Sequence, residues 1–359
     1  MEIKQENRQW LDDMRLEHPL VIAGPCSAET EKQVLETAHA LADSDVSMLR
    51  AGVWKPRTRP GSFEGVGGIA LPWLMRAKEE TGLQIAIEVG NTDHVKIALD
   101  HDVDCLWLGA RTTVNPFLVQ DLAEALAGTD RIVLVKNPVN PDLDLWLGAV
   151  ERLHAQGIKN LGVIHRGFST YRKTKYRNNP QWQIPIELQD RYPLLPLICD
   201  PSHIAGRREL VFDICQTALD LKMDGLMVET HPNPPEAWSD ARQQITPATM
   251  IQYMEDLRIR NLDFTGDDVQ KTLRELRDSI ANLDDQMLAL LGERMSVAEQ
   301  IGILKKKNNV AVLQREVWKA TQSRMEESGT KAGLNPDFIK KLYKAVHDES
   351  IAHQRKMFN

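Results

Sequence analysis

Four side chains of the kinds that bind transition metals stand far apart in the sequence, each at or beyond the end of a short apolar run. They are one cysteine, one histidine and two carboxylates: Cys26, His203, Glu229 and Asp240. This set suits a borderline divalent cation such as manganese, iron, cobalt or zinc, and it is too soft for a dedicated magnesium site. If the apolar runs are strands whose ends meet, the sequence predicts one metal site.

Six basic side chains lie at or after the ends of the same apolar runs. They are Arg50, Lys55, Arg57, Arg111, Lys136 and Arg166. Like charges that crowd together repel one another unless anions lie between them, and phosphate or carboxylate is the natural ligand of such a group. Each cation could instead be solvated or paired with an acid. Their common position favours an anion-binding pocket.

Two further cations interrupt an apolar stripe near the C-terminus. Arg294 and Lys305 are 11 residues apart, about 1100° of helix rotation, so they share one face of a helix. Unpaired charge on a packing face is costly, which predicts an anionic ligand or acidic partners there. Alternatively, both side chains extend to the edge of the bundle. Arg277, rotated by roughly 100° from Arg294, could reach a neighbouring subunit.

The elements that must position these side chains are short and regular. Up to about Ile259, the sequence contains eight apolar runs separated by helix-like stretches: Pro19–Ala23, Met48–Val53, Gln84–Val89, Cys105–Gly109, Arg131–Val135, Asn160–Ile164, Leu195–Cys199 and Gly225–Glu229. Eight such units in about 250 residues predict a closed (β/α)8 TIM barrel, whose catalytic groups lie at the C-terminal ends of the strands. An open doubly wound sheet is the alternative, although no GxGxxG or GxxxxGK[ST] motif supports it.

The last quarter of the chain has a different pattern. From Asp267 to about Lys307 there is no proline, and apolar residues recur in steps of four and three, as in a long helix packed against others. Helices are also predicted over residues 315–327 and 336–354. We therefore predict a barrel domain over residues 1–262 and an all-helical domain over residues 263–359. So long a first helix cannot cover its apolar face alone, which predicts a homodimer, or a larger homo-oligomer, through this domain.

Composition excludes several classes of protein. The chain has 44 basic and 51 acidic residues, a net charge of −7, which argues against a general nucleic-acid-binding or anionic-membrane-binding surface. No apolar run approaches the roughly 20 residues of a membrane helix, and the charged N-terminus is unlike a signal peptide. Four widely separated cysteines fit a reducing compartment. We expect a cytoplasmic protein.

The barrel motifs resemble a known family. In chain order, GPCS, LRAG, KPRT, GAR, VKNP, HRGF, DPSH and VETHPNP resemble the 3-deoxy-D-arabino-heptulosonate 7-phosphate (DAHP) synthases of the shorter type I subclass, which is related to the 3-deoxy-octulosonate 8-phosphate synthases. The resemblance covers residues 21–245. It implies a (β/α)8 barrel, the first enzyme of the shikimate pathway, that condenses phosphoenolpyruvate with erythrose 4-phosphate on a divalent metal ion, with manganese the first candidate. Metal-independent relatives lack the cysteine, so Cys26 favours metal dependence.

The resemblance also assigns roles. The metal ligands would be Cys26, His203, Glu229 and Asp240. The phosphate and carboxylate of phosphoenolpyruvate would be held by Arg111, Lys136 and Arg166, with Arg50 on the same side. Lys55 would lie between the substrates, and the phosphate of erythrose 4-phosphate would be bound by Arg57 and Thr58. Ala241 departs from the family, which usually has glycine there. The KPRT loop, which contains asparagine in the octulosonate relatives, favours the four-carbon sugar.

The helical segment resembles the all-helical chorismate mutases, through LRDSIANLDDQMLALLGERMSVAEQIGILKKK and HDESIAHQ. The resemblance implies a dimer that converts chorismate to prephenate. Chorismate would be held by Arg294 and Lys305, with Arg277 reaching across from the other subunit. Gln354 and Lys305 would contact the breaking ether oxygen, and Ser350 would line the pocket. Gln314 matches a polar position of the family, but Val317 stands where the family has an arginine.

The leading hypothesis is therefore a bifunctional enzyme, with DAHP synthase followed by chorismate mutase. A second hypothesis, suggested by Val317, is that the helical domain is mainly a sensor with weak mutase activity, through which prephenate or chorismate inhibits the synthase. A third is an octulosonate-type synthase that uses arabinose 5-phosphate.

Overall fold

The computed structural model describes residues 7–56, 61–171, 174–260 and 267–358 of the chain. The chain divides into two compact units, Met1–Arg260 and Asn261–Asn359. The predicted domain boundary, between residues 262 and 263, falls in segment 261–266, which lies outside the described residues.

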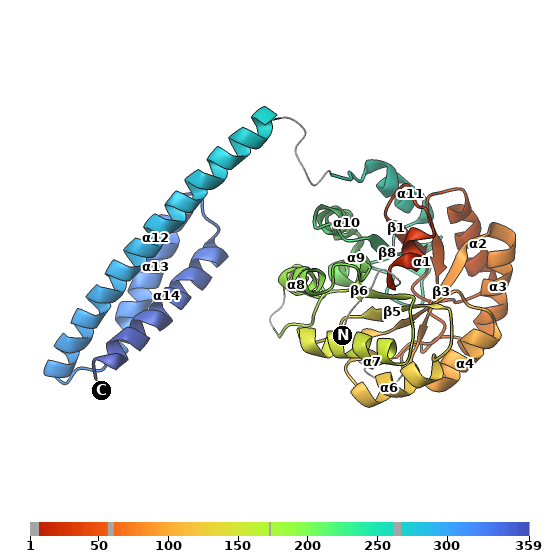
Figure 1. The fold of residues 1–359 in the computed structure, drawn as a ribbon, viewed down its shortest axis with the longest axis horizontal. Helices are drawn as coiled ribbons and strands as arrows, with labels where there is room; N and C mark the ends of the chain where they lie inside the picture. The colour runs from red at the N-terminus through yellow and green to blue at the C-terminus, as the bar shows by residue number, and fades with distance from the viewer. Residues whose placement is uncertain (1–6, 57–60, 172–173, 261–266, 359) are drawn as a thin grey trace. The chain divides into compact units, whose positions relative to one another are not determined.

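The first unit is a closed barrel of eight parallel strands in which each strand pairs with its neighbours in sequence and β8 pairs with β1 (Figure 1). This closure confirms the predicted TIM barrel and rules out the open doubly wound sheet. All strands except β3 are buried along their whole length, as the continuously apolar runs predicted. The strands are β1 (Leu20–Gly24), β2 (Met48–Arg50), β3 (Gln84–Val89), β4 (Cys105–Leu108), β5 (Ile132–Lys136), β6 (Leu161–His165), β7 (Leu197–Cys199) and β8 (Gly225–Glu229).

Helices surround the barrel and cover its outer face (Figure 1). Several begin at side chains that accept a backbone N–H of the first turn, such as Thr30 before α2 and Asp142 before α7. The helices are α2 (Glu31–Ala42), α3 (Ala70–Thr81), α4 (Thr92–Asp100), α5 (Ala110–Thr113), α6 (Pro116–Ala125), α7 (Leu143–Ala155), α8 (Gln183–Arg191), α9 (Pro201–Ala205), α10 (Val211–Asp220) and α11 (Pro247–Asp256).

Alternation along the strands decides which charged side chains enter the barrel. In β5, Val133 and Val135 belong to the outer core, while Ile132 and Leu134 fill the barrel interior. Lys136 therefore points inward at the C-terminal end of the strand. Three further charged side chains near strand ends point inward for the same reason, because each lies two positions after a residue that faces the barrel interior. They are Arg50, Glu88 and Glu229.

The opposite end of the barrel is closed. The short helix α1 (Gln9–Asp12) places Trp10 and Leu11 in the same apolar cluster as the interior strand residues. The indole N–H of Trp10 donates to the carbonyl of Leu161, at the start of β6, at 2.9 Å. Cys105 lies in this cluster, so it is a packing residue. Ligands can reach the barrel residues described here from the C-terminal ends of the strands.

The second unit consists of α12 (Asp267–Lys307), α13 (Arg315–Lys331) and α14 (Pro336–Lys356), and α14 packs against both other helices (Figure 1). The long first helix confirms the interpretation of the apolar stripe. Much of that stripe is uncovered within the chain, because Ile280, Leu283 and Leu290 keep 59%, 58% and 64% of their surface exposed. Among the described residues, no helix is long and apolar enough to cross a membrane.

Candidate active sites

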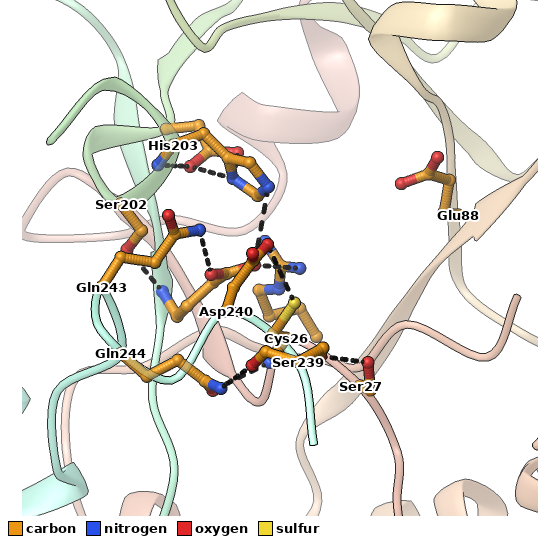
Figure 2. Close-up of polar contacts among 12 residues, drawn as sticks. Cys26, Ser27, Glu88, Ser202, His203, Ser239, Asp240, Gln243 and Gln244 are labelled. Atoms are coloured by element: carbon orange, nitrogen blue, oxygen red, sulfur yellow. Dashed lines mark hydrogen bonds and ion pairs between the residues drawn. The ribbon is translucent and has the colours of Figure 1, made fainter. Parts of the chain in front are cut away.

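The four predicted metal donors come together at the C-terminal end of the barrel. Ligand atoms of Cys26, Glu229 and Asp240 all lie within 4.8 Å of one another. His203 joins them through Nε2, which is 3.7 Å from Oε1 of Glu229. Figure 2 shows Cys26, Asp240 and His203 turned toward one centre. One thiol, one imidazole and two carboxylates on a single centre are a donor set that fits a borderline divalent metal ion.

Neighbouring side chains fix the orientation of these donors. Asp200 caps α9 by accepting the backbone N–H of His203, and its carboxylate also lies 2.9 Å from Nδ1 of the His203 ring. That contact assigns the ring proton to Nδ1 and leaves the lone pair of Nε2 facing Glu229. Burial lowers the pKa of His203, against the opposing effect of Asp200. The imidazole is therefore held neutral, as a metal ligand must be.

Glu229 and Asp240 are also held by hydrogen bonds. Gln243 Nε2 donates to Oε2 of Glu229 at 2.6 Å, and Arg177 Nη1 donates to Oδ1 of Asp240 at 3.0 Å. Burial would raise the pKa of Asp240, but Arg177 and then His203 lower it below its usual range. Asp240 has a left-handed φ of +47°, which aspartate tolerates. Among the described residues, Ala241 has no positive φ, so the alanine does not strain the loop.

The thiol of Cys26 is buried among charges. Burial, and then the carboxylate of Glu229, raises the pKa of Cys26 to about 12. Lys55 opposes this effect, because its Nζ lies 3.2 Å from Sγ of Cys26. With protein groups alone, the side chain is a thiol near neutral pH. Lys55 alone does not deprotonate the thiol, so a thiolate here requires a further positive charge such as a bound metal ion.

A cavity of about 340 Å³ opens above the metal donors. It is lined by His203 and Asp240 and by most of the predicted cations: Lys55, Arg111, Lys136 and Arg166. Arg57 and Thr58 lie in segment 57–60, outside the described residues. Four predicted cations and two of the predicted metal donors therefore border one cavity at the C-terminal ends of the strands.

The cations of this cavity are electrostatically crowded. Burial, opposed by Asp200 and reinforced by the positive charges of Arg177 and Arg111, lowers the pKa of Arg166 to about 10. Burial also lowers the pKa of Lys136, whose Nζ donates to Oδ2 of Asp200 at 2.7 Å. A bound phosphate or carboxylate would relieve this repulsion.

Arg50 does not line the cavity but lies at the base of the site, only 1% exposed. Its Nη2 donates to Oε1 of Glu229 at 3.2 Å, while Nε and Nη1 have no hydrogen-bond partner among the described residues. Buried donors without partners are costly, so they indicate where an oxygen-bearing ligand or water belongs.

The second cavity lies within the helical unit and has a volume of about 350 Å³. Five predicted residues line it: Arg294, Lys305, Gln314, Ser350 and Gln354. Arg294 Nη1 donates to the hydroxyl of Ser350, and Lys305 Nζ donates to Oε1 of Gln354 at 3.0 Å. Val317 lines the cavity where the resemblance expects an arginine, and Arg315 does not replace it among the lining residues. Arg277 is exposed on α12 and outside the cavity.

Family models match both units of the chain. The sequence model of the DAHP synthetase I family matches residues 13–260. The chain belongs to this family. The chorismate mutase type II model matches residues 276–355, so a DAHP synthase domain is followed by a chorismate mutase domain and the chain carries both enzyme types.

Individual relatives match the barrel. The phospho-2-dehydro-3-deoxyheptonate aldolase of Thermotoga maritima is 34% identical over 240 residues, covering 66% of this chain and 68% of the relative. A 2-dehydro-3-deoxyphosphooctonate aldolase of Nitratidesulfovibrio vulgaris is 30% identical over 241 residues, covering 61% of this chain and 84% of the relative. The crystal structure of the Thermotoga maritima DAHP synthase superposes with a TM-score of 0.60 at 29% identity, covering 66% of this chain and 67% of that one.

Two charged residues of the DAHP synthase cavity were missed by the sequence analysis. Glu88, labelled in Figure 2, lines the cavity. Its Oε2 accepts the indole N–H of Trp107 at 3.0 Å. Strand alternation could have found it, since Ala86 points into the barrel. Arg177 also lines the cavity, but it lies in an irregular segment after β6. No periodicity in the sequence marks its orientation.

Proposed function

We propose that the barrel condenses phosphoenolpyruvate with erythrose 4-phosphate, releasing inorganic phosphate, and that this reaction depends on a divalent metal ion held by Cys26, His203, Glu229 and Asp240. The observation that carries the proposal is that these four donors gather at one centre, and that two of them, His203 and Asp240, line the same cavity as four of the predicted cations. Manganese, iron, cobalt and zinc suit this donor set. When bound, such an ion supplies Lewis acidity to the aldehyde of the sugar phosphate.

The cations bind and orient the substrates. Arg111, Lys136 and Arg166 would hold the phosphate and carboxylate of phosphoenolpyruvate, and the unpartnered N–H groups of Arg50 face the base of the same site. Lys55, near Sγ of Cys26 and also in the cavity, is suited to lie between the substrates.

The reaction then needs charge compensation from these cations. As C3 of phosphoenolpyruvate attacks the aldehyde carbon, water adds at C2 and the phosphate departs. Fixed cations around the leaving phosphate stabilise the anionic charge throughout. The roles of Arg57 and Thr58 at the sugar phosphate stay predictions from the KPRT motif.

A mixed activity and chelation assay tests this proposal. The full chain is incubated with phosphoenolpyruvate and either erythrose 4-phosphate or arabinose 5-phosphate, and phosphate release is measured. We expect activity with erythrose 4-phosphate, loss of activity in chelator, and recovery with manganese, iron, cobalt or zinc but not magnesium. Chorismate conversion by the same sample needs no metal and serves as the internal control. Full condensation in chelator would contradict the metal proposal, and a preference for arabinose 5-phosphate would favour the octulosonate alternative.

We also propose that the second cavity converts chorismate to prephenate. The rearrangement is pericyclic and needs no nucleophile, so orientation and stabilisation of negative charge on the ether oxygen are sufficient. Arg294 would bind the substrate, and the hydrogen-bonded pair of Lys305 and Gln354 is placed to contact the ether oxygen. Ser350 and Gln314 would complete the polar lining.

A second copy of the chain would complete this pocket. The exposed apolar residues of α12 need a partner, and Arg277 lies on the same helix outside the cavity. A homodimer along α12 would cover the apolar stripe and could bring Arg277 of one copy to the cavity of the other. Sedimentation of the full chain tests this point, and a monomer at micromolar concentration would contradict it.

Feedback is the remaining part of the proposal. Prephenate or chorismate in the helical cavity would inhibit the barrel through binding linkage. The alternative is that the helical unit is mainly a sensor with little turnover, which Val317 in the pocket favours. Mutase turnover separates the two, and inhibition by prephenate that survives in Arg294→Ala would contradict feedback through this cavity.

A further inference from the structure

Each helix of the second unit contributes one regular face to the mutase cavity. On α14, the lining residues His347, Ser350, Ile351 and Gln354 follow one another at helical spacing, so their side chains share one face. Three of these residues are polar. Ser350 and Gln354 already have partners on α12, whereas His347 had no assigned role.

The face of α13 brings no positive charge to the cavity. Its lining residues are Val317, Trp318 and Thr321, and Gln314 lines the cavity just before the helix begins. Both cations of the lining, Arg294 and Lys305, come from α12. Chorismate carries two carboxylates, so a ligand that spans the cavity would place one of them away from α12. With Val317 in the arginine position, that carboxylate has no cation on α13.

His347 lines the same cavity and contacts the α13 residue next to Val317. Its ring stacks on the indole of Trp318, with ring centroids 3.9 Å apart and an interplanar angle of 17°. Stacking covers one face of the imidazole and fixes the plane of its ring. The edge of the ring, which carries both nitrogens, is not covered by this contact. Among the described residues, no protein group makes a hydrogen bond to either ring nitrogen of His347. An oriented donor that faces a cavity without a protein partner is available to a ligand.

We infer that His347 donates a hydrogen bond to one carboxylate of the dianionic substrate and so supplies the contact that Val317 cannot make. The inference rests on the proposed role of this cavity as the chorismate site. It names a substrate-binding residue on α14 that would act beside the two cations of α12 and the Arg277 that a second copy would supply.

The charges around His347 give this contact a pH dependence. Burial lowers the pKa of His347 from its ordinary value of 6.5, Asp348 on the same helix opposes this, and Arg294 and Lys305 from α12 lower it further. From α13 the ring meets the uncharged Trp318. A bound dianion adds negative charge beside the imidazole and offsets the two cations. Its pKa therefore rises on binding, and substrate binds more tightly to the protonated form.

Substitutions in the full chain test the inference. His347→Leu removes the donor and should raise KM for chorismate at pH 7 by about tenfold or more, with a smaller change in kcat. His347→Gln keeps an N–H donor and should stay within about threefold of the wild type. His353→Leu is the matched control, because His353 lies on the same helix but pairs with Glu299 outside the cavity. Its KM should not change.

A pH series provides a readout that a merely structural role would not affect. Wild-type KM should fall as the pH is lowered from 8 to 6, and this fall should be absent in both His347 variants. Adding Val317→Arg to His347→Leu should return KM toward the wild-type value, since residue 317 lines the same cavity. Thermal unfolding of each variant verifies that it is folded.

Three results separate the possible failures. Unchanged KM in folded His347→Leu, or a wild-type pH dependence that persists in His347→Gln, would overturn the inference and leave the mutase function intact. If the wild type binds chorismate without converting it, calorimetric Kd replaces KM and the same ratios are expected. A wild type that neither binds nor converts chorismate would overturn the proposed function, and with it the role of His347.

Discussion

Charged side chains in the barrel cavity are oriented by buried partners that do not themselves line the cavity. Gln243, 1% exposed, bridges Glu229 and Arg177: its amide N–H donates to Glu229 and its carbonyl oxygen accepts from Arg177 at 2.7 Å. Gln244 similarly accepts the backbone N–H of Cys26 at 3.0 Å (Figure 2). Such contacts fix the directions of donor atoms before a ligand arrives.

Gln243 therefore allows a test at the residue scale. Gln243→Leu should weaken binding of manganese to the full chain by about tenfold to a hundredfold, because Glu229 keeps the bond from Arg50 but loses the shorter bond that orients Oε2. Calorimetric titration of the metal-stripped protein measures the change. Gln120→Leu, which removes an exposed hydrogen bond on α6, is the control and should leave Kd unaltered. Equal affinities for the two variants would argue against this role of Gln243.

At the scale of elements, the end of β6 directs neighbouring side chains alternately toward the cavity and into the outer core. Arg166 follows the strand and lines the cavity, whereas His165 points outward and is fully buried. The His165 ring lies among Trp146, Phe168 and Trp182, with centroids 5.3 to 6.4 Å away. Burial, only partly offset by the backbone at Pro180, lowers the pKa of His165 to about 3.

This burial predicts acid sensitivity of the barrel. Since His165 is neutral in the folded state and its ordinary pKa is 6.5, the unfolded chain binds the extra proton between about pH 6.5 and 3. Burial of neutral His165 therefore contributes fully to the free energy of unfolding above about pH 6.5. As the pH drops below 6.5 this contribution decreases, by about 1.4 kcal/mol at pH 5.5. Denaturant unfolding, followed by tryptophan fluorescence at pH 7 and 5.5, should show this loss in the wild type. In His165→Leu the loss of stability between pH 7 and 5.5 should be smaller by about the contribution of His165. An identical pH effect in the wild type and the variant would refute the assignment of acid sensitivity to His165.

The sequence predicts elements and strand-end residues better than it predicts contacts. Continuous apolar runs identify buried parallel strands, and the C-terminal ends of such strands meet, so Lys136 and Glu229 could be assigned to one site. Arg177 could not, because an irregular loop carries no periodicity. Nor could the stacking of Trp318 on His347, since it depends on how α13 and α14 pack.

For the whole molecule, net charge and local charge differ. The chain has a net charge of −7, yet both cavities are lined by cations. A negative net charge therefore disfavours binding of extended polyanions to the surface, but it does not prevent small anions from binding in these pockets. Each cavity is built from residues of one unit. The central claim is therefore that one chain carries two chemically separate sites.

Crossed substitutions in the full chain, with both activities measured on each variant, test this claim most directly. Cys26→Ala should abolish condensation of phosphoenolpyruvate with erythrose 4-phosphate and leave conversion of chorismate nearly intact, because only the barrel loses a metal donor. Arg294→Ala should reduce chorismate conversion by at least about a hundredfold and preserve condensation. Condensation at the wild-type rate in Cys26→Ala, or chorismate conversion at the wild-type rate in Arg294→Ala, would contradict the account.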